Sequence, residues 1–122
     1  MMKPTSTITS ETTFKNWINY LLKKEGFLTQ NHEDEYLPAI PDTSFSCWRC
    51  NGWIEYKWEK GKYQPGQKRW LDKRAKLGGH CFTIRGWLDR FEITNHRFDD
   101  NRTISVARVD WKDALKIHLL TP

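Results

Sequence analysis

Residues 53–58 read Trp-Ile-Glu-Tyr-Lys-Trp, and thirteen residues before the glutamate the chain carries Pro41-Asp42. The aromatic and β-branched content of the run is typical of a β-strand, whose side chains alternate between two faces. We therefore expect Glu55 and Lys57 to lie on one face of this strand. Asp42 belongs to the preceding segment of the same expected hairpin, which brings a second carboxylate beside Glu55.

Two carboxylates and an ammonium group at one place in a sheet form a compact set with a definite chemistry. Hard carboxylate oxygens bind divalent cations such as Mg²⁺, and a lysine beside them can orient a water or help to deprotonate it. The combination indicates metal-dependent phosphodiester hydrolysis. An ordinary surface strand preceded by a Pro-Asp turn is the alternative interpretation. It explains less, because the other residues of the strand are aromatic or apolar.

The composition limits the class of protein. A chain of 122 residues forms one domain, so we expect a flexible arm at residues 1–9 and a single domain at 10–122. Twenty Lys and Arg against fifteen Asp and Glu give a formal charge of +5, which favours a polyanionic partner such as DNA. The sequence shows no membrane-spanning or secretory segment, so we expect a cytoplasmic protein that does not bind membranes.

Aromatic residues are abundant, with seven Trp, six Phe and four Tyr. We expect most of these rings in the core of the domain. The alternative for a few of them is stacking on unpaired bases or lining a DNA groove.

Periodicity and capping signals predict a mixed α/β domain. One helix is expected between the N-cap Ser10 and Gly26, and another over Gln67–Leu77 with Pro65 in its first turn. Asn51-Gly52 predicts a hairpin turn. Strands are expected near residues 27–29, 44–48, 53–58, 80–85 and 103–109, with a short helix or turn at 87–91 and a last helix after Asp110.

An ordered series of short motifs resembles the PD-(D/E)XK nuclease superfamily. Within it the series is most similar to the VRR-NUC type, found as stand-alone phage proteins and as the nuclease module of larger repair enzymes. The residues that carry the resemblance are Glu55-Tyr56-Lys57, Gly61, Pro65, Gln67, Trp70-Leu71, Leu77-Gly78-Gly79 and Phe82 to Arg85. Each motif is common alone, whereas the ordered series from Asp42 to Arg85 is fairly specific.

The resemblance implies a restriction-endonuclease-like core, in which a central mixed β-sheet is flanked by helices. It also implies a DNA endonuclease that depends on Mg²⁺ or Mn²⁺ and prefers branched, flapped or nicked DNA. A phage origin, and with it the cytoplasm of the host cell, is suggested by the same resemblance.

The resemblance also implies roles for individual residues. Asp42 and Glu55 are expected to bind the metal, with the backbone carbonyl of Tyr56 completing its shell. Lys57 is expected to position the attacking water, and Gln67 to help hold the site. The segment between Asp42 and the strand departs from the family pattern in bulk and in its cysteines, which leaves substrate specificity open.

Glu11 has two interpretations. It resembles an acidic residue that some family members use as an additional metal ligand. It also follows the expected N-cap, where an acidic side chain favours the positive end of a helix. Both interpretations stay open from the sequence.

Cys47 and Cys50 form a C-x-x-C motif beside the expected site. With His80 and Cys81 they offer four ligands for Zn²⁺. Because His80 and Cys81 are adjacent on an expected strand, their side chains point to opposite faces. We therefore favour Cys81 as a buried core thiol, and zinc at Cys47 and Cys50 stays the weaker alternative.

Basic residues follow the expected site on the next turn and helix. A solvated helix face explains some of them, and contacts with DNA phosphates explain others. The predicted DNA-binding residues are Lys60, Lys62, Lys68, Arg69 and Lys73.

The alternative function is a non-catalytic nucleic-acid-binding protein on the same fold. A basic and aromatic surface would serve it equally well. However, a pure binder gains nothing from two carboxylates that face a phosphate, which favours the enzyme. A nuclease of this size that cuts two strands is expected to act as a homodimer.

Overall fold

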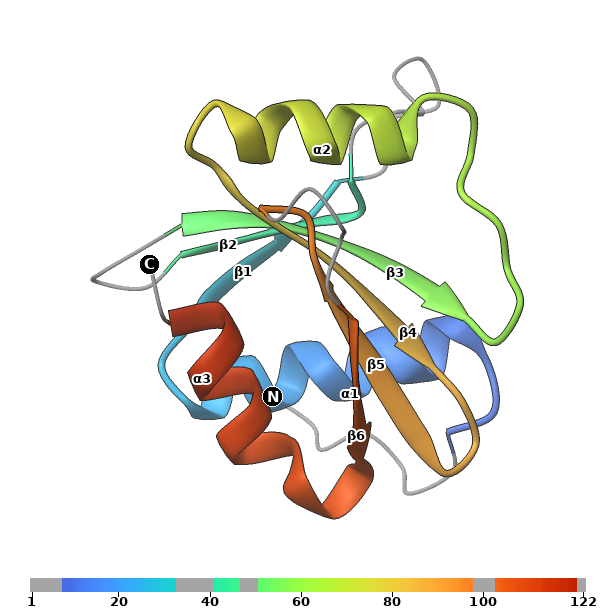
Figure 1. The fold of residues 1–122 in the computed structure, drawn as a ribbon. Coiled ribbons are helices and arrows are strands. Elements are labelled where there is room, and N and C mark those ends of the chain that lie inside the picture. Colours follow the sequence, from blue (N-terminus) through green and yellow to red (C-terminus); the bar gives the residue numbers. More distant parts are fainter. Residues whose placement is uncertain (1–7, 33–40, 47–50, 98–102, 121–122) are drawn as a thin grey trace.

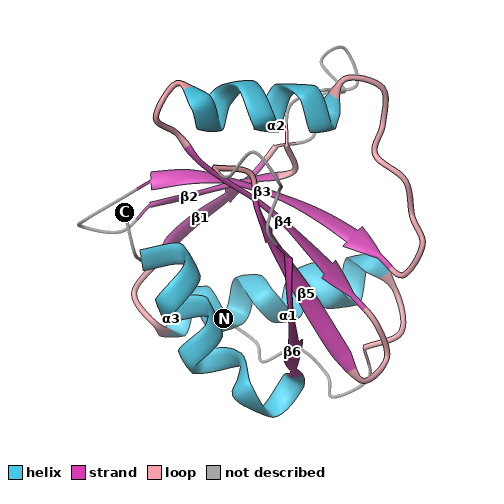
Figure 2. Ribbon diagram, viewed as in Figure 1, coloured by secondary structure: helices cyan, strands magenta, loops and turns pink. Residues whose placement is uncertain are grey.

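In the computed structural model, residues 8–32, 41–46, 51–97 and 103–120 are described, the last five of these as backbone only. They form one six-stranded sheet with helices on both faces (Figures 1 and 2). Helix α2 covers one face, and α1 and α3 lie against the other. The elements are α1 (Glu11–Lys24), β1 (Leu28–Asn31), β2 (Thr43–Ser46), β3 (Asn51–Trp58), α2 (Gln67–Lys76), β4 (His80–Gly86), β5 (Arg90–Asn95), β6 (Thr103–Ala107), the 3-10 helix η1 (Arg108–Asp110) and α3 (Trp111–Leu120).

The sheet follows chain order, β1-β2-β3-β4-β5-β6. Strands β3 and β4 pair in parallel, and the other four pairs are antiparallel. A parallel pair requires a crossover, and α2 supplies it between β3 and β4. The predicted central mixed sheet flanked by helices is confirmed.

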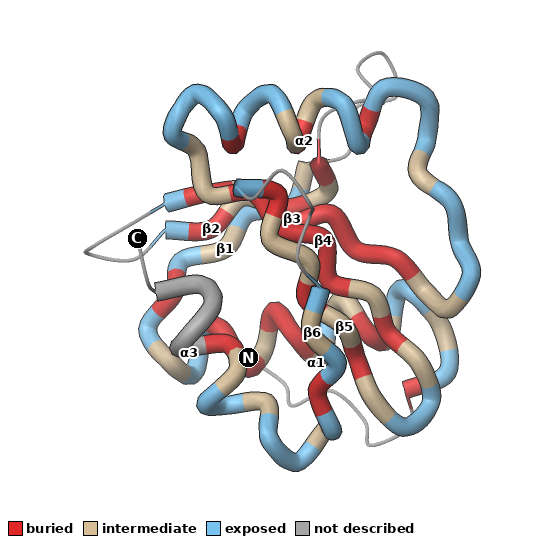
Figure 3. The backbone as a smooth tube through the Cα atoms, viewed as in Figure 1, coloured by how far each residue is buried: buried red, intermediate tan, exposed pale blue. Residues whose placement is uncertain are grey.

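The two faces of the sheet carry different cores. Buried positions lie along α1, β3 and β4, whereas α2 is more exposed (Figure 3). A large apolar cluster lies under α1 and α3 and includes Phe14, Ile18, Tyr56, Phe82 and Leu115. The cluster under α2 is small, consisting of Leu71, Ala75 and Cys81 with partly buried rings around it. Polar side chains are buried among the odd-numbered residues of β3 and β4, which face α2. The α2 face therefore has room for a polar site.

Capping signals placed the helix ends well. Ser10 caps α1 by accepting a hydrogen bond from Thr13 N, and Gly26 follows the helix with φ of 91°. Gly78, with φ of 98°, ends α2 as expected. Pro65 lies outside the helix, because the N-cap of α2 is Gly66, so its predicted place in the first turn is wrong.

The predicted hairpin turn at Asn51-Gly52 is wrong. Both residues belong to β3 and pair with Ser46 and Phe45 of β2. The glycine serves close packing instead, since a Cβ at Gly52 would lie 2.0 Å from the carbonyl oxygen of His80. The connection between β2 and β3 lies outside the described residues.

The predicted helix or turn at residues 87–91 is wrong in its second half. Strand β5 begins at Arg90, where Phe91 and Ile93 point into the core while Glu92 and Thr94 are partly exposed. This alternation is typical of a strand. The residues before it favour a turn, so the start of the strand could not be placed from the sequence.

The predicted flexible arm at residues 1–9 is too long at its carboxyl end. Ile8 is buried in the large core, and Thr9 N donates to Thr13 Oγ1 of α1. Residues 1–7 lie outside the described part of the chain, so for them the arm stays a prediction.

Candidate active site

Asp42 and Glu55 are held together by reciprocal hydrogen bonds between neighbouring strands. The register of β2 and β3 pairs Thr43 with Ile54, which brings the two carboxylates side by side. Asp42 N donates to Glu55 Oε1 at 3.2 Å, and Tyr56 N donates to Asp42 Oδ2 at 3.2 Å. Each carboxylate thus accepts a hydrogen bond from the backbone of the segment that carries the other carboxylate, so both side chains are fixed.

Lys57 completes the set on the same face of β3. Its Nζ lies 3.0 Å from Glu55 Oε2 and donates to Gln67 Oε1 at 3.1 Å. The same amide oxygen of Gln67 accepts from Gln64 N at 2.7 Å. Glu55 and Lys57 are only 1% and 6% exposed. The lysine is therefore held in one orientation by groups that are themselves fixed.

The predicted backbone role of Tyr56 has a structural context. Its side chain points to the opposite face, where Tyr56 Oη donates to Asn19 Oδ1 at 2.7 Å. Asn31 Oδ1 then accepts from Asn19 Nδ2 and from Thr43 Oγ1, both at 3.2 Å. This chain of hydrogen bonds, buried at Tyr56 and Asn19 and exposed at Asn31, ties α1 to the first three strands beside Asp42 and was not predicted from the sequence.

The electrostatics of the site show an excess of negative charge. Burial raises the pKa of Glu55 to about 7, and repulsion by Asp42 adds to it, while Lys57 opposes the rise. Burial and the charge of Asp42 also raise the pKa of Glu11, in the first turn of α1. Glu11 therefore lies within electrostatic reach of Asp42 and Lys57, as both of its interpretations allow.

The donor set fits a divalent cation that keeps part of its water shell. Among the described residues, no three His, Cys, Asp or Glu side chains gather closely enough to enclose a metal alone. Mg²⁺, however, is commonly held by one or two carboxylates with several waters. Asp42 and Glu55 supply two carboxylates whose repulsion a cation would relieve.

Of the three cysteines, one lies in the described part of the chain and two lie outside it. Cys81 is a buried free thiol, as predicted, and burial raises its pKa to about 12. Cys47 and Cys50 lie outside the described residues. Zinc at the C-x-x-C motif stays a prediction.

A second chain of polar contacts, buried at Thr83 and His96 and exposed at Lys68, lies beside the site and was missed from the sequence. Tyr63 Oη and Thr83 Oγ1 are 2.7 Å apart, and Thr83 Oγ1 lies 2.8 Å from His96 Nε2. His96 Nδ1 contacts Asp72 Oδ1 at 2.6 Å, and Asp72 Oδ2 lies 2.8 Å from Lys68 Nζ. Burial works against ionisation of Asp72, but its hydrogen bonds from Lys68 and His96 lower its pKa overall.

This chain reaches the active site through two contacts. Thr83 of β4 pairs in register with Glu55 of β3, and the Tyr63 ring lies 5.6 Å from Lys57 Nζ. Strand alternation indicates that Thr83 faces α2 once the parallel pairing is known. No local pattern indicates the partners of His96, because they lie far from it in sequence.

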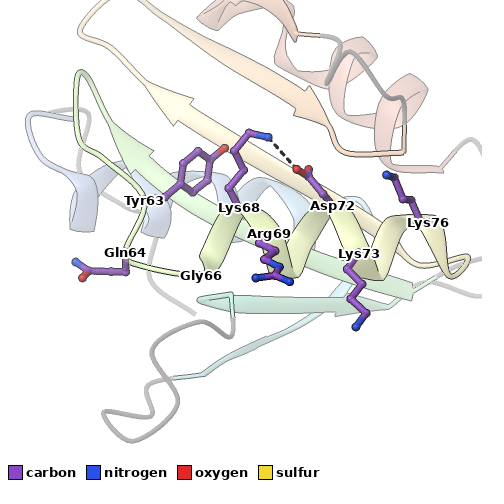
Figure 4. A pocket seen from close by; sticks show the side chains of 8 residues that line it. All are labelled: Tyr63, Gln64, Gly66, Lys68, Arg69, Asp72, Lys73 and Lys76. Atoms are coloured by element: carbon purple, nitrogen blue, oxygen red, sulfur yellow. Dashed lines mark hydrogen bonds and ion pairs between the residues drawn. The ribbon is translucent and has the colours of Figure 1, made fainter.

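A basic hollow of about 790 Å³ lies along the outer surface of α2 (Figure 4). Lys68, Asp72 and Lys76 extend on one side of the helix, whereas Arg69 and Lys73 extend on the other. Together with Tyr63, Gln64 and Gly66 these residues form its lining. Three of the predicted DNA-binding residues thus lie on one surface, and one of them, Lys68, is paired with Asp72.

Lys60 and Lys62, the other predicted DNA-binding residues, are exposed on the loop between β3 and α2. Arg85 Nη1 fixes this loop by donating to the carbonyl oxygens of Glu59 and Gly61 at 2.7 and 2.6 Å. The two lysines therefore lie on a loop whose backbone is fixed next to the carboxyl end of β3.

Comparison with known proteins identifies similar folds. No family model matches the chain, and no curated protein matches it. Among solved structures, Hjc, a Holliday junction resolvase from the archaeal hyperthermophile Archaeoglobus fulgidus, is similar with a TM-score of 0.54. The match covers 80% of this chain and 87% of that one at 15% sequence identity. The fold is restriction-endonuclease-like. At this identity the likeness concerns the fold, and the activity is a separate question. In the described ranges, no helix is both long and apolar enough to cross a membrane.

Proposed function

We propose that this protein is a divalent-metal-dependent DNA endonuclease that hydrolyses phosphodiester bonds. The observation that carries the proposal is the buried Glu55–Lys57 ion pair with Asp42 clasped beside it across β2 and β3. Burying charged side chains is costly, and a surface strand needs none of these contacts. A nuclease site explains why all three groups are held in one place.

In the proposed mechanism, Asp42 and Glu55 would hold the cation, with the backbone carbonyl of Tyr56 as a further ligand. A bound divalent ion would lower the pKa of a water and polarise the phosphate. Lys57 orients the attacking water and balances charge on the phosphate, and its amide contact with Gln67 keeps Nζ directed at the site. Glu11 adds a third carboxylate from α1.

The substrate class is DNA with a branch, flap or nick. The positive surface of α2 supports a nucleic acid, because its cations can contact backbone phosphates independently of sequence. The similar archaeal protein is a Holliday junction resolvase, which favours branched DNA within this class. Cutting both strands of a junction requires two sites, so we propose a homodimer.

The proposal extends to the nuclease type, the metal ion, the origin and the location of the protein. We assign the chain to the VRR-NUC type because of its ordered motifs from Asp42 to Arg85. Mg²⁺ or Mn²⁺ as the ion, a phage origin and a location in the host cytoplasm follow from that assignment.

The test is cleavage of labelled duplex, nicked duplex, flap and four-way-junction DNA with Mg²⁺, with Mn²⁺ and with EDTA. We expect cleavage with either metal, none with EDTA, and the fastest rate on a branched or nicked substrate. Binding of all substrates with no cleavage in any metal would favour the non-catalytic DNA-binding protein instead.

A further inference from the structure

We propose that a hollow between β3 and α2 binds an unpaired base of the DNA beside the cleaved phosphate. The hollow has a volume of about 320 Å³ and is lined by Trp53, Trp70, Lys73, Arg74 and Leu77. It is distinct from the catalytic groups, and it deepens the proposed function by naming a single-stranded nucleotide as part of the substrate.

Trp70 offers the surface for stacking. Trp53 has two ring neighbours, His32 at 5.1 Å and Trp70 at 5.4 Å between centroids. Trp70 meets Trp53 at an interplanar angle of 79°, and within the described part of the chain Trp53 is its one aromatic ring partner. Trp70 is also partly exposed. Trp53 therefore supports Trp70 from one side, while a face of Trp70 remains for a base.

The charge of the hollow fits a nucleotide. Trp70, Lys73, Arg74 and Leu77 are three or four residues apart in and just after α2, so they share one flank of the helix. Neither cation has an acidic neighbour in the lining, which contains no Asp or Glu. An aromatic face with two cations at its rim is the combination that binds single-stranded nucleic acid through base and phosphate together.

The position of the hollow relates it to the catalytic groups. Trp53 and Glu55 are two residues apart on β3, so their side chains leave the same face about 7 Å apart along the strand. A base on Trp70 would therefore belong to a nucleotide close to the phosphate at Glu55. The volume lies at the lower end of the range of about 300–1,000 Å³ for ligand pockets, which suits one base rather than a duplex.

The test measures binding in EDTA, where a metal-dependent nuclease does not cut. The probes are a fluorescent blunt duplex, the same duplex with a single-stranded overhang, and that duplex with abasic sites throughout the overhang. Wild-type protein should bind the normal overhang roughly 5- to 100-fold more tightly than the abasic one, since stacking of one base contributes about this much. The abasic probe keeps the phosphates, so it separates stacking from charge.

Variants locate the effect. Trp70→Leu should remove the preference for the normal overhang, whereas Trp70→Phe should keep most of it. Trp87→Leu is the matched control, because Trp87 follows β4 at the far end of the sheet from Trp53. Thermal melting of each variant checks that it is folded.

The outcomes separate this inference from the nuclease proposal. Equal affinity of wild-type protein for normal and abasic overhangs would overturn the base pocket, and so would a folded Trp70→Leu variant that keeps the preference. Neither result bears on the proposed nuclease activity. A base preference that depends on Trp70, in a protein that cuts no DNA with any metal, would support the pocket and sink the nuclease.

Discussion

Glu55 is a buried carboxyl group whose protonation couples the stability of the metal-free protein to pH. Its pKa rises from 4.5 to about 7 on folding. A raised pKa means that the folded state favours the proton, so the contribution of Glu55 to stability is full below about pH 4.5 and is lost as pH rises to about 7. One pKa unit corresponds to about 1.4 kcal/mol, so the total effect is on the order of 3 kcal/mol.

We therefore expect Glu55→Gln to flatten this part of the pH dependence in EDTA. Mg²⁺ or Mn²⁺ should stabilise the wild-type protein more at pH 8 than at pH 6, because the ion binds the ionised carboxylate. Urea unfolding of both proteins across this pH range measures the effect. Identical pH profiles for the two proteins would contradict the assigned environment of Glu55.

Gln67 is a positioning residue whose amide oxygen accepts from Lys57 Nζ and Gln64 N. We expect Gln67→Ala to lower kcat about 10- to 100-fold with a smaller change in KM, as found for groups that orient catalytic residues. Gln64→Ala is the matched control, since the Gln64 side chain points outward and its backbone N–H is unchanged (Figure 4). Steady-state cleavage kinetics distinguish the two, and an equal loss in both variants would argue against the role of Gln67.

The sequence predicted that Asp42, Glu55 and Lys57 lie side by side, because this juxtaposition follows local rules. Alternation puts Glu55 and Lys57 on one face, and the hairpin brings Asp42 beside them. His96 and Thr83 escaped prediction because their contacts join β4, β5 and α2. Such contacts depend on strand order and pairing direction, which no short stretch of this chain encodes.

At the scale of elements, the β3–β4 pairing depends on a glycine. A Cβ at Gly52 would lie 2.0 Å from the carbonyl oxygen of His80 in the adjacent parallel strand. We expect Gly52→Ala to lower the free energy of unfolding by about 3 kcal/mol, at the upper end of typical overpacking costs, because backbone atoms must move. Denaturant unfolding measures the loss.

Gly78→Ala is the control for that experiment. Gly78 has a φ of 98° but open space around its Cα, so alanine there meets only conformational strain of about 1–2 kcal/mol. A loss at Gly52 no greater than the loss at Gly78 would contradict the close approach of β3 and β4.

The outer surface of α2 presents the cations that we assign to DNA. Arg69 and Lys73 extend from the helix on the side away from Lys68 and Asp72 (Figure 4). Arg69→Ala and Lys73→Ala should each reduce the magnitude of the slope of log K against log salt by about 1, because each removes about one phosphate contact. Fluorescence anisotropy across a salt series measures the slope. Unchanged slopes in both variants would mean that the DNA does not bind to this surface of α2.

Helices and strands with clear caps or apolar patterns were predicted, and those hidden by turn residues were not. The signals at Ser10 and Gly78 mark the ends of α1 and α2 correctly. Asn51-Gly52 misled because the same dipeptide serves a hairpin turn in one setting and close strand packing in another. The choice between a turn and close strand packing depends on the pairing of Gly52 with His80, which lies far along the chain.

For the whole molecule, the unequal cores on the two faces of the sheet explain where the function lies. The large cluster under α1 and α3 provides the stability of the domain. The smaller cluster under α2 leaves a polar layer that holds Glu55, Lys57 and Gln67. The α/β class and the mixed sheet were predictable from the sequence, whereas the complete strand order required β5, which was not predicted as a strand.

The central claim is that Asp42, Glu55 and Lys57 act together as a metal-dependent nuclease site. The most direct measurement is the single-turnover rate of junction and nicked-duplex cleavage in Mg²⁺ and Mn²⁺, with binding of the same DNA measured in EDTA. The variants are Asp42→Asn and Lys57→Met, which keep side-chain size. Their controls are Asp89→Asn on the β4–β5 turn and Lys112→Met on α3, both exposed.

We predict that the wild-type protein and both controls cut, whereas Asp42→Asn and Lys57→Met lose at least about 100-fold in rate and still bind the DNA. Cleavage by Asp42→Asn and Lys57→Met at the wild-type rate would contradict the account, because the buried charges would then serve the fold alone.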